Sequence, residues 1–272
     1  MNLTFIVDDY ALIWNLLFRA NFEEKIYKLK QKIWATYKNE YNSLLNDKKL
    51  FLNDYKNFIP NNDTIYNILL DNDDYHVLKK QADKYRIELM RIWDKNKKIT
   101  NSFIKDVIRI NLDNYNVFVV NKEFNIIEVS NNNIIIGREL NSQCNNHILA
   151  DLNKSIIDSC MKKYDGENEI FKNTILELAF DNEYMTRLEE KSFYSKGMNT
   201  SLKKWLYPYW LMYLGVEKDD FLSYMMRDGL SFEVSKYAYE KELSRMNIEE
   251  FIDFCIRNKR YIVRVKNQIE VL

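Results

Sequence analysis

Over most of the first 110 residues, an apolar side chain recurs at every third or fourth position. This spacing places the apolar side chains on one face of an α-helix. The segment EEKIYKLKQKIWATYKNEYNSLL shows this at Ile26, Leu29, Ile33, Tyr37, Tyr41 and Leu44, with Lys and Glu on the opposite face. The segment DYHVLKKQADKYRIELMRIW shows it again at Leu78, Ala82, Tyr85, Leu89 and Ile92. The pattern predicts helical hairpins, with a first helical region over residues 8–59 that ends at Pro60. Thr100 is expected to cap a further helix that runs to about Ile110.

The pattern changes at Tyr115 to short runs of β-branched and aromatic residues. YNVFVV, NIIEV and NIIIG are separated by NKEF and SNNN. Asparagine tolerates the left-handed backbone conformation that tight turns require. The sequence therefore predicts a small antiparallel meander over about residues 115–137. A terminal strand, RYIVRV, is a further candidate.

Helical spacing resumes after Gly137. Helices are expected at about 145–163, 167–190, 200–214, 217–228, 232–244 and 248–258. The predicted fold is a mainly helical α+β class, with a helical N-terminal region, a small sheet near the middle and a helical C-terminal half. No flexible linker is visible between the parts. We therefore expect one compact unit in which residues 1–110 form a helical subdomain and residues 111–272 hold the sheet and the later helices.

Composition narrows the classes of function. Five Gly and two Pro in 272 residues are too few for the turns of a β-sandwich or barrel. The 40 basic and 40 acidic side chains cancel, so the net charge favours neither nucleic acid nor an anionic membrane as a partner. There is no apolar run of membrane-spanning length and no signal-peptide pattern, and the three cysteines form no CxxC pair. A cytoplasmic location is expected.

One candidate for chemistry is the segment HILAD, residues 147–151. His147 and Asp151 are four residues apart, so they project from the same face of a helix. This is the spacing of the two metal ligands in the zinc-binding motif HExxH. The alternative is a solvent-facing polar stripe, which Lys154 and Asp158 would extend.

A second candidate lies in NTILELAFDNEYMTRL, residues 173–188. Glu183 falls on a mostly apolar helical face, where a carboxylate needs a partner. Arg187, one turn later, can supply an ion pair. Glu183 is thus either half of a supporting pair with Arg187 or a metal ligand.

The densest aromatic block is LYPYWLMYLG, residues 206–215. Its aromatic residues, which are typical of binding surfaces, are Tyr207, Tyr209, Trp210 and Tyr213. They could form a surface for a protein or peptide partner. The alternative is a buried helix with Pro208 in its first turn and Gly215 at its C-cap, since a helix that is apolar on nearly every face is usually buried.

The order of these parts resembles that of the gluzincin branch of zincin metallopeptidases, and in spacing the small minigluzincins, over about residues 115–190. In that family an edge strand precedes the HExxH helix, and a helix with the pattern NExx(S/T) brings the third zinc ligand. NIIIG would correspond to the edge strand, HILAD to the active-site helix and NEYMT, residues 182–186, to the glutamate helix. The resemblance implies a zincin-like fold, zinc as the metal, and His147, Asp151 and Glu183 as its ligands.

The same resemblance predicts that the chain is catalytically degenerate. The glutamate that acts as general base in HExxH is replaced by Ile148, which cannot accept a proton from water. No sequence pattern points to another residue that could act as the general base in its place. The alternative function is a non-enzymatic helical module that binds a protein or peptide, and a third is an active zinc-dependent, peptidase-like hydrolase with unrecognised ligands. Apart from zinc, no motif calls for a cofactor.

Overall fold

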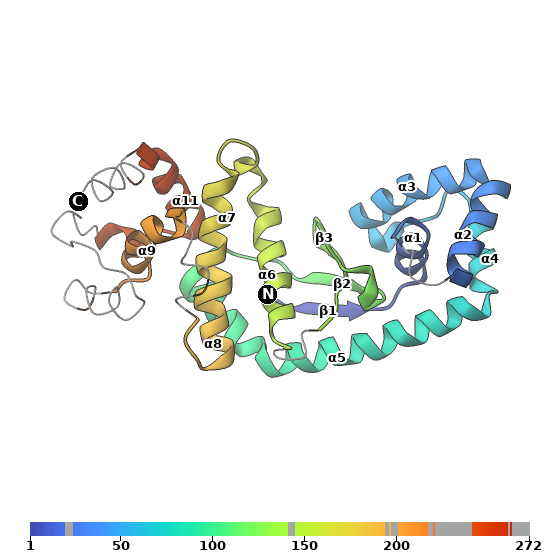
Figure 1. Ribbon diagram of the computed structural model, residues 1–272, viewed down its shortest axis with the longest axis horizontal. Coiled ribbons are helices and arrows are strands. Elements are labelled where there is room, and N and C mark those ends of the chain that lie inside the picture. The colour runs from blue at the N-terminus through green and yellow to red at the C-terminus, as the bar shows by residue number, and fades with distance from the viewer. Residues whose placement is uncertain are drawn as a thin grey trace. The chain divides into compact units, whose positions relative to one another are not determined.

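The computed structural model describes residues 1–19, 24–140, 145–193, 196, 201–216, 220, 241–260 and 262. Helices predominate, and there is a small four-stranded sheet, three strands of which lie near the middle of the chain (Figure 1). The predicted class, mainly helical α+β, is confirmed. In the described part, no helix combines the length and the apolar character needed to cross a membrane. Apart from residue 220, the helix predicted at 217–228 lies outside the described residues, as does most of the strand RYIVRV. Of the helix predicted at 232–244, only residues 241–244 are described, and they belong to a 3₁₀ turn.

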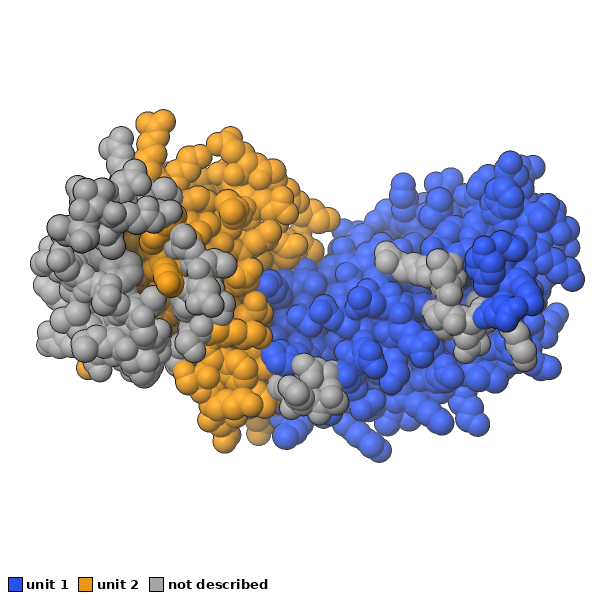
Figure 2. Space-filling model, viewed as in Figure 1, with its two compact units in different colours: residues 1–95, 112–155 blue, residues 96–111, 156–272 orange. Residues whose placement is uncertain are grey.

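Packing divides the chain into two compact units (Figure 2). Unit 1 comprises residues 1–95 and 112–155, and unit 2 comprises residues 96–111 and 156–272. This division differs from the predicted single unit with a subdomain boundary near residue 110. The sheet belongs with the N-terminal helices, because its first strand is residues Leu3–Ile6 at the very start of the chain.

The helices of unit 1 begin with the predicted 8–59 region, which is three separate α-helices. These are α1 (Asp9–Arg19), α2 (Glu24–Thr36) and α3 (Lys38–Asn53), followed by a short 3₁₀ turn, η1 (Tyr55–Asn57), and by α4 (Thr64–Leu70). The apolar stripe passes from α2 to α3 through Tyr37, whose φ of −127° and ψ of 49° break the helix. The spacing of apolar residues was right, but a periodic pattern does not reveal a change of axis between two helices.

The long helix α5 (Asp73–Phe103) continues into a π-helical segment, η2 (Ile104–Ile108). The predicted cap at Thr100 is wrong, because this residue lies inside α5. Its hydroxyl hydrogen-bonds the carbonyl of Asn96 at 3.1 Å and the hydroxyl of Tyr184 at 2.6 Å. A buried threonine can thus satisfy its hydroxyl within a helix as well as at its start.

The sheet has the order β1-β2-β4-β3, with β1 (Leu3–Ile6), β2 (Tyr115–Val119), β3 (Ile126–Ser130) and β4 (Asn133–Gly137). Strand β3 pairs with β4 in an antiparallel hairpin, but β2 runs parallel to both β1 and β4. The predicted simple meander is therefore wrong for β2. The 3₁₀ turn η3 (Lys122–Phe124) between β2 and β3 makes the connection too long for a tight hairpin, so β2 pairs with β4 instead.

Both faces of the central strands are buried, which explains the continuous apolar runs in the sequence. Phe118 and Ile135 are paired in register on one face, and Val117 and Ile134 on the other, and all four are 0% exposed. At the end of β4, a Cβ on Gly137 would lie 2.4 Å from the carbonyl oxygen of Asn121, so only glycine fits. Along the sheet runs α5, whose Tyr85 hydroxyl donates to the carbonyl of Arg138 at 2.7 Å (Figure 1).

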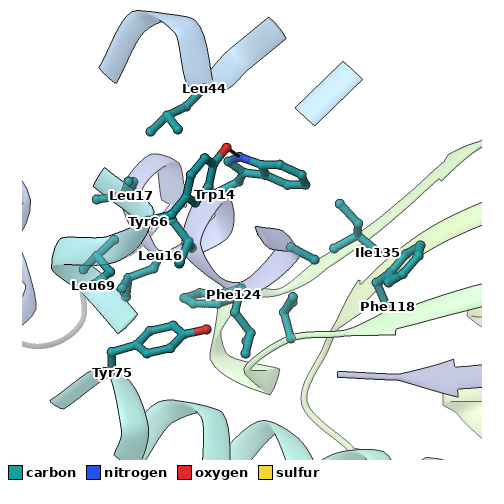
Figure 3. Close-up of a cluster of buried hydrophobic side chains, with 14 of the residues drawn as sticks. Trp14, Leu16, Leu17, Leu44, Tyr66, Leu69, Tyr75, Phe118, Phe124 and Ile135 are labelled. Carbon is teal, nitrogen blue, oxygen red and sulfur yellow. Dashed lines mark hydrogen bonds between the residues drawn. The ribbon is translucent and has the colours of Figure 1, made fainter. Parts of the chain in front are cut away.

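The core of unit 1 is built around the aromatic side chains of the first helices and the sheet (Figure 3). Trp14 is fully buried, and its Nε1 donates to the hydroxyl of Tyr66 at 2.8 Å. The Tyr66 hydroxyl donates in turn to the carboxylate of Asp47 at 2.9 Å. This chain of hydrogen bonds lets polar atoms lie inside an aromatic cluster without losing their partners.

Unit 2 contains the later helices. They are α7 (Glu169–Glu177), the π-helical segment η5 (Leu178–Tyr184), α8 (Met185–Glu189), α9 (Ser201–Tyr213) and α11 (Ile248–Arg257), with 3₁₀ turns η4 (Lys162–Tyr164) and η7 (Lys241–Arg245). Helix α6 (His147–Cys160) begins in unit 1 and ends in unit 2. The predicted helices at 145–163, 167–190, 200–214 and 248–258 are confirmed. Asn247 forms a capping box with Glu250 at the start of α11.

Candidate functional site

The first predicted site residue, His147, is the first residue of α6 and is half-buried. The next residue, Ile148, is only 3% exposed and belongs to the apolar side of the helix with Leu149 and Leu152. A side chain that packs in this way is held by the hydrophobic effect. The position that carries the general base in HExxH is therefore a core position in this chain.

The second predicted ligand, Asp151, lies one turn along α6 and is half-buried. Its Oδ2 is 3.3 Å from Nη1 of Arg138, which follows β4 directly in sequence. The ion pair links the end of the sheet to the first turns of α6. The carboxylate of Asp151 thus helps to hold the start of α6 near the end of β4.

Glu183, the third predicted ligand, lies in the π-helical segment η5 and is 7% exposed. Its Oε1 accepts a hydrogen bond from Nε of Arg187 at 2.9 Å, so the structure contains the predicted supporting pair. The π-helical turn itself was not predicted. Short π-helical segments within α-helices are frequent at functional sites.

The neighbours of Glu183 in NEYMT have structural roles that the sequence did not indicate. The side-chain amide of Asn182 donates to the carbonyls of Phe193 and Lys196 at 2.6 and 3.0 Å. The hydroxyl of Thr186 donates to the carbonyl of Asn182 at 2.7 Å and accepts from the amide of Phe193 at 3.0 Å. The Asn and Thr of the motif thus hold the chain that follows α8.

The two candidate carboxylates do not have the surroundings of zinc ligands. Asp151 faces the guanidinium of Arg138, and Glu183 faces that of Arg187. A zinc ion would have to displace these cations, because a ligand carboxylate must direct its oxygens at the metal. Within the described ranges, no group of three or more His, Cys, Asp or Glu side chains is arranged to hold a metal ion. His147 belongs to unit 1 and Glu183 to unit 2.

The aromatic block of residues 206–215 lies in α9 and is buried. Tyr207, Trp210 and Tyr213 are 0% exposed and Tyr209 is 4% exposed. The structure thus places these residues in a core and not on a surface for a partner, because their rings pack against α11, as Trp210 and Tyr213 do against Phe251. The predicted C-cap is confirmed, since Gly215 has a φ of 82° and the amide of Val216 donates to the carbonyl of Leu211. The predicted place of Pro208 in the first turn is wrong, because α9 begins at Ser201 and Pro208 lies inside it.

The cysteines differ in accessibility. Cys255 is fully buried in α11, and burial raises the pKa of its thiol well above the usual value. Cys160, at the end of α6, is exposed, and Cys144 lies outside the described residues. A thiolate, not a thiol, is the reactive form, so Cys255 is not suited to nucleophilic catalysis.

We therefore expect iodoacetamide at pH 8 to modify Cys160 in the folded protein and to leave Cys255 unmodified. Peptide mapping by mass spectrometry identifies each modified site. In 6 M guanidinium chloride, which serves as the control, both residues should be modified. Modification of Cys255 in the folded protein at a rate close to that of Cys160 would contradict its burial.

A site that the sequence did not indicate is a cavity of about 640 Å³ in unit 1, beside the start of α1. It is lined by Asp8, Asp9, Tyr10, Ile13, Ile59, Pro60, Asn61, Asn62, Asp63, Tyr66, Asn67 and Leu70. Its volume falls in the range of small-ligand sites. The available signal was the pair of acidic-polar segments DDY and PNND, but these are about 50 residues apart and only the packing of α1 against α4 brings them together.

Comparison of the chain with protein-family models, with curated proteins and with solved structures gives no match. The function is therefore inferred from the chain's own residues.

Proposed function

We propose that this chain is a zincin-like domain that has lost the peptidase machinery and acts in the cytoplasm by binding a protein or peptide. The observation that carries the proposal is the burial of Ile148, at 3% exposure, in the position of the general base. A zinc peptidase needs a carboxylate there to take a proton from the metal-bound water. An aliphatic side chain in the core cannot replace it.

The arrangement of elements supports the zincin-like part of the proposal. Strand β3 is an edge strand, antiparallel to its neighbour β4, and α6 follows β4 with His147 as its first residue. A later helical segment carries Asn182 and Glu183. One correspondence needs correction, since NIIIG is β4, an inner strand with all five residues buried, and it is the preceding strand β3 that lies at an edge of the sheet.

The ion pairs of Asp151 and Glu183 support the loss of the metal. Each carboxylate that would bind zinc has an arginine partner in its own unit. Removing one member of such a pair leaves the other without its counter-charge. The arginines therefore stabilise the fold without a metal, and we expect the purified wild-type protein to contain no stoichiometric zinc.

Restoring the second histidine tests this proposal. We expect Asp151→His to raise the affinity for zinc at least about 100-fold, because two imidazoles four residues apart on a helix can bind one ion. If Glu183 occupies the third-ligand position, adding Glu183→Gln should weaken zinc binding about 10- to 100-fold, the usual effect of disturbing a zinc site. Isothermal titration calorimetry with zinc chloride measures both affinities, and metal analysis of the tag-free wild type and a His147→Ala variant measures native content.

The matched control for Glu183→Gln is Glu169→Gln, an exposed glutamate in the first turn of α7. Equal zinc affinities with Glu183→Gln and Glu169→Gln would overturn the zincin-like arrangement. Stoichiometric zinc in the wild type that is lost in His147→Ala would overturn the loss of the metal. Hydrolysis of casein by the zinc-free wild type would overturn the loss of catalysis.

A further inference from the structure

The cavity beside α1 has two kinds of wall. Apolar surface comes from Ile13, Pro60 and Leu70, together with Ile59, which is 79% exposed although it is a large aliphatic residue. The lining also carries the carboxylates of Asp8, Asp9 and Asp63. Such a combination of apolar surface with a few charged groups is typical of a site that recognises a specific small group.

The carboxylates of the lining are not balanced by basic residues within it. No Lys or Arg is found among the described residues that line the cavity. Asp9 is partly neutralised from outside, since its carboxylate lies 2.8 Å from Nζ of Lys79 and accepts a hydrogen bond from the Tyr75 hydroxyl at 2.5 Å. The cavity thus keeps a negative potential.

The other two aspartates contribute to this potential in different ways. Asp8 accepts hydrogen bonds from the amides of Tyr10 and Ala11 at 2.9 and 3.2 Å and begins α1, so its position is fixed. Burial raises the pKa of its carboxyl group, although the two amide hydrogen bonds oppose this shift. Asp63 stands at the N-cap position of α4 but makes no capping hydrogen bond, so its exposed carboxylate is available at the mouth of the cavity.

Tyr10 lines the same cavity as these acids. Burial raises the pKa of the Tyr10 hydroxyl, and the charges of Asp8 and Asp63 raise it further. The ring is held by edge-on contacts with Phe58 and Tyr66, at centroid distances of 5.1 and 4.9 Å. The face of a fixed aromatic ring attracts cations, and the carboxylates beside it attract them as well.

We propose that this cavity binds a positively charged nitrogen group, an alkylammonium or a guanidinium, carried on an apolar stem. The charged group would lie between Asp8 and Asp63, and the stem would lie along Tyr10 and Ile59. The side chains of lysine and arginine in a partner protein have this chemistry, and so do free aliphatic amines. The inference goes beyond the proposed function and does not depend on a zincin-like fold, because every residue that lines the cavity lies in residues 8–70 of unit 1.

Binding of agmatine, and of an acetylated five-residue peptide with one arginine between glycines, tests this proposal. The citrulline form of the peptide has almost the same shape without the charge. We expect the arginine peptide to bind at least about 10-fold more tightly than the citrulline peptide, and salt to weaken its binding. Isothermal titration calorimetry at 20 mM and 300 mM sodium chloride provides the measurement.

The variant Asp63→Asn should weaken binding of the cationic probes about 5- to 10-fold, since it removes a partly exposed ion pair and little packing. Asp71→Asn, at the other end of α4 and outside the cavity lining, is the matched control and should have no effect. Tighter binding of the peptide than of agmatine indicates a protein side chain as the ligand, and the reverse indicates a free amine. Equal binding of the arginine and citrulline peptides, equal effects of the two variants, or no binding of either cationic probe at millimolar concentration overturns the proposal.

Discussion

Trp14→Ala is expected to lower the free energy of unfolding of unit 1 by about 3–5 kcal/mol, the usual loss when a buried tryptophan is truncated. The Trp14 side chain is 0% exposed and contacts Phe51 and Phe58 edge-on, at centroid distances of 4.9 and 5.7 Å. The variant would also remove the hydrogen bond that Nε1 donates to Tyr66. The Tyr66 hydroxyl would keep Asp47 as its acceptor, so the main loss is packing.

The chain contains its own matched control for this prediction. Trp34, in α2, is 48% exposed, and Trp34→Ala removes the same side chain from a surface. We expect a change of about 0.5 kcal/mol or less there. Urea unfolding followed by circular dichroism, combined with hydrogen exchange of the amides in α1 and β2, measures the loss in unit 1. Equal destabilisation by the two variants would show that the aromatic cluster is not the core of this unit.

Arg109→Ala should lower the free energy of unfolding of unit 2 by about 2–4 kcal/mol, because hydrogen bonds to a charged group contribute more than neutral ones. The guanidinium donates to the carbonyls of Ser244, Met246 and Tyr213 at 2.7, 2.8 and 3.2 Å. It also lies 4.7 Å from the centroid of the Tyr213 ring. One side chain thus joins the end of η2 to α9 and to the segment before α11.

The backbone of Arg109 gives this prediction a second test. Its φ of 60° is in the left-handed region, which ends the π-helical segment and favours glycine over alanine. Arg109→Gly should therefore be less destabilising than Arg109→Ala by about 1 kcal/mol, although both lose the guanidinium. Arg257→Ala, where an exposed Nε donates to the carbonyl of Asp253 at 3.3 Å, is the control and should change stability by about 0.5 kcal/mol or less. Thermal unfolding and hydrogen exchange in α9 and α11 measure the differences. A loss with Arg109→Ala no larger than with Arg257→Ala would contradict the role of Arg109.

The sequence-based predictions were right where a feature depends on neighbours along the chain. The stripe from Leu29 to Leu44 packs against the core of unit 1 as its spacing required. The pair of Glu183 and Arg187 follows from four-residue spacing on a helix, and the cap at Gly215 follows from the conformational freedom of glycine. These interactions span one helical turn, so local rules determine them.

The predictions failed where the partner of a segment comes from far along the chain. Leu3–Ile6 reads as an ordinary apolar run, yet it is a strand because Tyr115 and its neighbours pair with it more than 100 residues later. For the same reason β2 pairs with β4 rather than with the next strand in sequence. Apolar runs of four or five residues fit several pairings equally well, and only the whole sheet selects one.

The candidate sites divide in the same way. The sequence by itself determined the mainly helical class, the helices predicted at 145–163, 167–190, 200–214 and 248–258, and the replacement of a general base by Ile148, since each depends on residue type and local spacing. Only the tertiary structure decided that Ile148 and the aromatic block of α9 are buried, that arginines face Asp151 and Glu183, and that Asp8 and Asp63 share a cavity. Burial and ion pairing depend on which surfaces meet, and these surfaces come from segments that are distant in the sequence.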